Sequence, residues 1–73
     1  MHRWEKDTRY YQAIVHQDLL GDWVVLKMWG SKLSKLGLHV IEVVDSQEQG
    51  RARVEQIAII RKKRGYCIVT KRL

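Results

Sequence analysis

The stretch Gly21-Asp22-Trp23-Val24-Val25-Leu26-Lys27-Met28-Trp29-Gly30 decides the fold of this 73-residue chain. It is rich in β-branched and aromatic residues, and glycines bound it at both ends, a combination typical of a β-strand. We expect a strand over residues 23–30. Because successive side chains of a strand point to opposite faces, the residues divide into two sets: Val24, Leu26 and Met28 on one face, and Trp23, Val25, Lys27 and Trp29 on the other.

A second strand is expected just before this one, over residues 9–17, where β-forming residues alternate weakly. The segment between them, Asp18-Leu19-Leu20-Gly21-Asp22, predicts a hairpin connection, because Gly and Asp accept the positive φ that tight turns require. Residues 1–8 are polar apart from Trp4, and we expect them to be a flexible lead-in to a single domain over residues 9–73.

Beyond the central strand, a loop with two lysines leads to a third strand over residues 38–44. A helix then begins at Asp45 or Ser46, each followed three positions later by a residue that completes a capping box. It runs to about Arg64, because Gly65 suits the position after a helix end. The helix should turn one stripe inward: Gly50, Val54, Ile57, Ala58 and Arg61. A short strand over residues 66–70 follows.

This order predicts an α+β fold, with three strands, a helix and one strand in a small antiparallel sheet that the helix covers on one face. We expect the covered face to carry Tyr11, Ala13, Val15, Val24, Leu26 and Met28. The open face would then be unusually apolar, with Tyr10, Ile14, Trp23, Val25 and Trp29. Such a patch indicates an interface. The alternative is that residues 1–8 fold back over it through Trp4.

The net charge of +6 is concentrated at one end of the chain. Residues 1–50 carry six basic and seven acidic side chains, whereas residues 51–73 carry eight basic side chains and only Glu55. This asymmetry indicates a polyanionic partner, and the alternative is a solvated helix surface.

Several classes of protein are not expected from this composition. The chain has no apolar run long enough to span a membrane, no secretory signal sequence and one cysteine, which together favour the cytoplasm. The soft metal ligands His2, His16, His39 and Cys67 follow no zinc spacing, and we expect Cys67 to be a buried thiol. We find no catalytic constellation and predict no enzyme, cofactor or metal site.

Four pieces of the chain, in order, resemble the WGR domain, a family named for a Trp-Gly-Arg motif. They are Arg9-Tyr10-Tyr11, Asp18-Leu19-Leu20-Gly21-Asp22-Trp23, Trp29-Gly30, and the basic helix end from Arg61 that closes on Gly65-Tyr66. The resemblance covers about residues 9–66. It implies a non-catalytic DNA-binding module similar to short bacterial proteins of this family, in which Trp29 packs on nucleic acid. The third motif residue is Ser31, which supplies no guanidinium.

We therefore expect nucleic acid, DNA in particular, to bind through an aromatic contact and a basic surface. The candidate residues are Lys27, Trp29, Gly30, Lys32, Lys35, Arg61, Lys62, Lys63 and Arg64. An indole can stack on a base, and lysines beside it can contact phosphates. The competing interpretation is a protein-interaction module or homodimer that uses the open sheet face.

Overall fold

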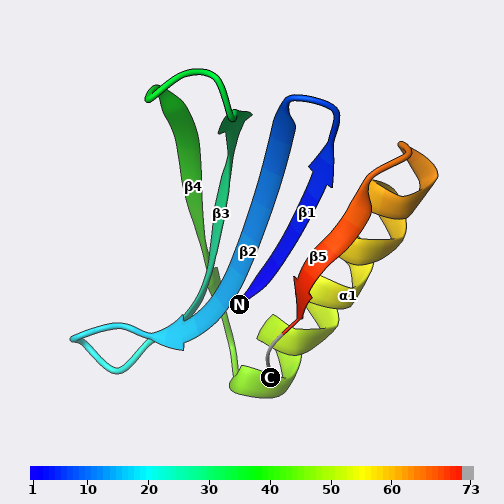
Figure 1. The fold of residues 1–73 in the computed structure, drawn as a ribbon. Coiled ribbons are helices and arrows are strands. Elements are labelled where there is room, and N and C mark those ends of the chain that lie inside the picture. The colour runs from blue at the N-terminus through cyan, green and yellow to red at the C-terminus, as the bar shows by residue number, and fades with distance from the viewer. Residues whose placement is uncertain (72–73) are drawn as a thin grey trace.

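A computed structural model gives the fold of the chain and describes residues 1–71. Its elements are β1 (His2–Lys6), β2 (Arg9–Gln17), β3 (Trp23–Ser31), β4 (Gly37–Val44), α1 (Gln47–Lys63) and β5 (Cys67–Lys71). The strands form one antiparallel sheet in the order β4-β3-β2-β1-β5. Figure 1 shows α1 packed on one face of this sheet, where its main contacts are with β2 and β3. The α+β class is confirmed.

The sheet has one strand more than the sequence predicted, because part of the expected lead-in forms β1. This strand lies between β2 and β5 and pairs with both. Its Trp4 is buried, with 3% of its surface exposed. The single aromatic residue among polar neighbours is thus a core residue, and a two-residue turn with Asp7 at φ 53° returns the chain to β2.

Two local signals determine where α1 begins and ends. Ser46 is the N-cap, and its Oγ accepts a hydrogen bond of 3.1 Å from the backbone N–H of Gln49. At the other end Gly65 has φ 85°, and the N–H groups of Gly65 and Tyr66 donate to the carbonyls of Lys62 and Arg61. This pair of hydrogen bonds is a Schellman motif. The helix therefore ends where Gly65 predicted its end.

The expected division of the sheet into two faces was wrong. In the observed register Ala13 lies opposite Lys27, and Val15 lies opposite Val25. Residues directly opposite each other share a face. The helix therefore covers the face of β3 that carries Trp23, Val25, Lys27 and Trp29, and the open face carries Val24, Leu26 and Met28. Both faces of β3 are apolar, so the sequence pattern does not distinguish them.

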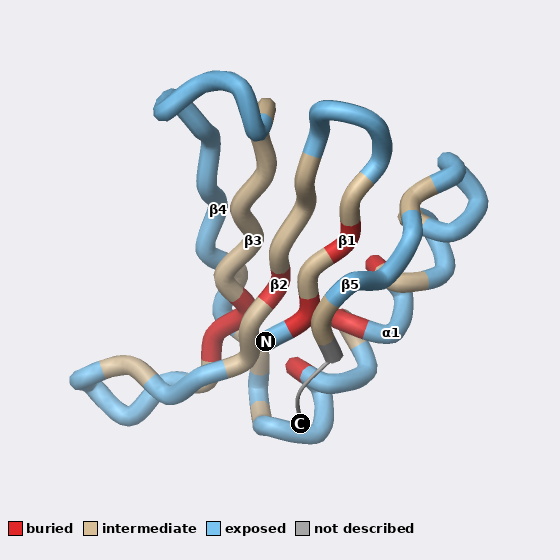
Figure 2. Tube along the Cα trace, viewed as in Figure 1, coloured by how far each residue is buried: buried red, intermediate tan, exposed pale blue. Residues whose placement is uncertain are grey.

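The core lies between α1 and the middle of the sheet, as the buried segments in Figure 2 show. Its buried members are Trp4, Ala13, Val25, Val54 and Ile57. The predicted inward stripe of α1 is confirmed at Gly50, Val54 and Ile57, which are buried. A Cβ atom at Gly50 would lie only 2.7 Å from Cγ1 of Val15, so the glycine allows α1 to approach the sheet closely.

No helix among residues 1–71 is both long enough and apolar enough to cross a membrane.

Candidate nucleic-acid interface

A groove runs between the last turn of α1 and the ends of β2 and β3. Its volume is about 460 Å³. Its lining combines four cationic and four aromatic residues and contains no carboxylate: Arg9, Tyr10, Tyr11, Lys27, Trp29, Gly30, Ser31, Arg61, Arg64 and Tyr66. We call this surface the basic groove.

Aromatic side chains form a row across the helix-covered face of the sheet. His2 stacks on Trp4, Trp4 meets the edge of Tyr11, and Tyr11 stacks on Trp29 with ring centres 5.7 Å apart and planes at 10°. Trp29 ends the row and is half-buried. Because Tyr11 covers one face of the indole, only its other face and edge are available to a ligand.

Arg61 joins the helix to this aromatic row. Its guanidinium carbon lies 4.4 Å from the ring centre of Tyr11 and 5.1 Å from that of Tyr66, within cation–π distance. Its Nε atom is buried and has no hydrogen-bond partner among residues 1–71. The aliphatic stem therefore packs on the core stripe while the charged head reaches the basic groove.

Two further arginines stand at the mouth of the groove. Arg9 and Arg64 are exposed, and together with Lys6, Arg61 and Tyr66 they line an adjoining hollow of about 380 Å³. Lys6 Nζ donates a hydrogen bond of 2.8 Å to the backbone carbonyl of Arg64, which ties β1 to the helix end. In the described part of the chain, neither Arg9 nor Arg64 forms an ion pair with a carboxylate.

The remaining cation of the groove, Lys27, is held by Glu42 of β4. Lys27 Nζ lies 2.6 Å from one oxygen of this carboxylate, and Arg53 Nε of α1 lies 2.9 Å from the other. Hydrogen bonds from Arg53 and Lys27 lower the pKa of Glu42 from its ordinary value of 4.5 to about 2. Glu42 thus stays ionised in neutral solution and offsets much of the charge that Lys27 brings to the groove.

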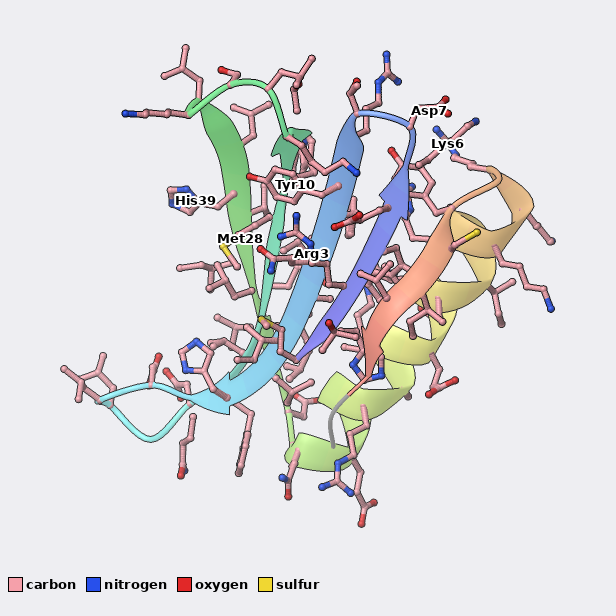
Figure 3. The ribbon with its side chains drawn as sticks, in the orientation of Figure 1. Arg3, Lys6, Asp7, Tyr10, Met28 and His39 are labelled. Atoms are coloured by element: carbon pink, nitrogen blue, oxygen red, sulfur yellow. The ribbon has the colours of Figure 1, made fainter. Side chains whose placement is uncertain are left out.

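Gly30 has a packing reason to be a glycine. A Cβ atom there would lie 3.3 Å from the hydroxyl oxygen of Tyr10, and one at its cross-strand partner Gly37 would lie 2.9 Å from the same atom. The Tyr10 side chain therefore crosses a pair of glycines on the open face, where Figure 3 shows it near Arg3. The guanidinium of Arg3 lies 4.7 Å from the centre of the Tyr10 ring.

The structure brings together five of the nine predicted site residues. Lys27, Trp29, Gly30, Arg61 and Arg64 line the basic groove.

The other four predicted residues lie outside the groove lining. Lys32 Nζ pairs with Glu5 at 3.0 Å, on the open face of the sheet. Lys35 is exposed in the loop before β4, and Lys62 and Lys63 are exposed on α1.

Sequence reasoning missed five lining residues, which are Arg9, Tyr10, Tyr11, Ser31 and Tyr66. A signal existed for Tyr11, because a hairpin register that pairs Arg9 with Ser31 places Tyr11 opposite Trp29.

Two other expectations concern the soft ligands. Cys67 is exposed, so its prediction as a buried thiol was wrong; it lies on the edge strand β5, where no layer covers it. Within residues 1–71, no three His, Cys, Asp or Glu side chains are grouped so that they could hold a metal ion.

Comparisons of the chain with family models, with curated proteins and with solved structures gave no match.

Proposed function

We propose that the chain is a non-catalytic nucleic-acid-binding module, WGR-like in its motifs, that binds DNA in the basic groove without sequence preference. The observation that carries the proposal is the lining of this groove: arginines without a carboxylate partner beside a row of aromatic rings. Cations at such a surface contact phosphates, and aromatic rings stack on bases or sugars.

The three arginines supply the electrostatic part of binding. Arg9 and Arg64 are exposed, and Arg61 is held over two tyrosines, so their charges converge on one strip of surface. Arginine is suited to this task because its planar guanidinium forms paired hydrogen bonds with phosphate. Each phosphate neutralised releases condensed counterions, so binding should weaken steeply as salt is added.

Trp29 supplies the stacking part. Its stack on Tyr11 fixes the indole in one orientation, so little side-chain freedom is lost on binding. A base or sugar would lie against the indole face that Tyr11 leaves uncovered. Stacking on a protein aromatic ring contributes about 1–3 kcal/mol per base.

A matched pair of double variants tests the proposal. Arg9→Gln with Arg64→Gln removes two charges from the groove, whereas Lys35→Gln with Lys62→Gln removes two charges outside it. Anisotropy of a short labelled duplex, and of its single strand, measures affinity over a range of salt. We expect the groove variant to reduce the slope of log K against log salt by about 1.8 for the duplex, from two lost phosphate contacts.

The control variant should keep the wild-type slope within about 0.5. An equal reduction of the salt slope in the two variants would mean that binding follows net charge alone, and the groove assignment would then be wrong. Absence of any binding at low salt would overturn the functional proposal as a whole.

A further inference from the structure

Strand β4 forms one edge of the sheet and exposes apolar side chains on both faces. The exposed fractions are 64% for Leu38, 42% for Val40, 58% for Ile41 and 70% for Val43. The one charged residue of the strand, Glu42, turns inward to Lys27 and Arg53. A strand that is apolar on both faces is typical of the interior of a sheet.

The other edge is better protected than β4, whose one protective feature is the inward-turned charge of Glu42. Proteins protect edge strands by keeping them short, by bulges, and by lysine or proline, because an unpaired edge invites another strand. Strand β5 is five residues long, shifts register against β1 and ends at Lys71. Strand β4 spans eight residues, pairs with β3 without a register shift, and contains neither lysine nor proline.

The apolar surface continues past both ends of β4. The loop between β2 and β3, beside the Val44 end, exposes Leu19 and Leu20, and the loop between β3 and β4 exposes Leu33 and Leu36. Figure 1 shows both loops on the side of the molecule that β4 borders. Of thirteen large hydrophobic side chains exposed within residues 1–71, eight lie on β4 or in these two loops.

We propose that a second copy of this chain pairs with β4 through its own β4, antiparallel, about a two-fold axis perpendicular to the sheet. Such a contact is self-complementary, as a two-fold interface must be. Antiparallel pairing places the loop after β3 of one copy beside the loop before β3 of the other, so the two pairs of leucines meet. The backbone groups of both edges become hydrogen-bonded.

Charge complementarity selects a second copy as the occupant. One loop carries Asp18 and Asp22, whereas the loop at the opposite end of β4 carries Lys35 and also Lys32, which pairs with Glu5 of its own chain. In the antiparallel pair the acidic loop of each copy faces the basic loop of the other, at both ends of the interface. This attraction counters the repulsion between two chains that each carry a net charge of +6.

Because the two-fold axis is perpendicular to the sheet, the helix-covered faces of the two copies lie on the same side of the dimer. The dimer would therefore have a continuous ten-stranded sheet, with both copies of α1 behind it and both basic grooves open on that side. Pairing through β4 leaves the groove arginines uncovered, because they lie on β2, on α1 and at the C-cap of α1. Self-association and nucleic-acid binding are thus independent, and each can fail without the other.

The first arm of the test places a lysine on the edge. Nuclease-treated protein is measured by sedimentation equilibrium in high salt, so that nucleic acid cannot bridge copies. We expect the wild-type protein to be a dimer. Ile41→Lys should raise its dissociation constant at least about tenfold, and Ile59→Lys should leave the dissociation constant unchanged. Ile59 is a matched control on α1, with 56% of its surface exposed. A wild-type monomer, or a dimer that tolerates Ile41→Lys, would overturn the proposal.

The second arm reverses charges in the loops, at low salt and without any change in β4. Asp22→Lys and Lys35→Glu should each weaken the dimer several-fold, and the two together should restore it. The loops stand at opposite ends of an eight-residue strand, about 26 Å apart, so rescue cannot arise within one copy. Equal affinity in all four proteins would show that the loops do not meet and would contradict the antiparallel arrangement.

Discussion

Substitution of Glu42 by glutamine should make the domain less stable and its binding of nucleic acid stronger. Glu42 holds Lys27 and Arg53 through short ion pairs, and Gln would keep the shape of the side chain while removing its charge. The variant therefore separates the two roles of Lys27, which are its contact within the sheet and its charge in the basic groove.

The expected loss of stability follows from the pKa of Glu42. Its fall from 4.5 to about 2 on folding corresponds to a ceiling of about 3 kcal/mol. The Glu42 side chain is 30% exposed, so solvent screening reduces the contribution to about 1 kcal/mol. A carboxyl group whose pKa is lowered by folding stabilises the native state above its unfolded pKa. This contribution is complete above about pH 5 and disappears as the pH falls from 4.5 to about 2.

Urea denaturation across this pH range measures the effect. The free energy of unfolding of Glu42→Gln should lie about 1 kcal/mol below wild type at pH 7, and the two should converge near pH 2. A constant difference at every pH would mean that the loss comes from packing and that the ion pairs contribute nothing.

The gain in affinity of Glu42→Gln for nucleic acid follows from counterion release. If the released Lys27 contacts one further phosphate, the logarithm of the association constant rises by about 0.9 for each tenfold reduction in salt below 1 M. At 0.1 M salt the affinity would therefore rise by up to about eightfold. Glu55→Gln is the control, because it makes the same change in net charge and Glu55 lies outside the groove lining. Binding by Glu42→Gln that is no tighter than by Glu55→Gln would refute the reasoning.

Two further predictions concern packing. Gly50→Ala should lower the free energy of unfolding by about 1 kcal/mol, because overpacking against Val15 outweighs the gain in helix propensity. In a Val15→Ala background the same substitution should raise stability. A double-mutant cycle from thermal melts measures both effects. Trp4→Ala should cost about 3–5 kcal/mol and leave most of the chain unfolded at room temperature by circular dichroism, since β1 carries a core residue; a loss below about 1 kcal/mol would mean that β1 is dispensable.

Local signals in the sequence predicted the elements of the fold well. Ser46 and Gly65 fixed the ends of α1, and Gly21, with φ 89°, closes the expected hairpin. These residues act through their own backbone or their nearest neighbours. The first strand escaped prediction because its only apolar signal is Trp4, and one aromatic residue does not establish an alternation.

The relation between elements was harder to predict than the elements themselves. The two faces of β3 are both apolar, so only the register with β2 shows which one α1 covers. The same register brings Tyr11 beside Trp29, and the placement of α1 brings Arg61 over Tyr11 and Tyr66. Contacts of this kind depend on three-dimensional placement. The density of charge along the chain instead favoured Lys62 and Lys63, which lie outside the groove lining.

The pairing of β1 with β5 has a consequence for the order in which the domain folds. Strands β1, β2, β3 and β4 follow one another in a meander, so each can pair with the strand before it as soon as it leaves the ribosome. Strand β1 pairs His2 with Lys71, almost the full length of the domain apart. Because closing so long a loop is slow, completion of the sheet around Trp4 awaits synthesis of the last strand. We expect the nascent chain to hold an open meander first and to complete its sheet only after β5 has emerged.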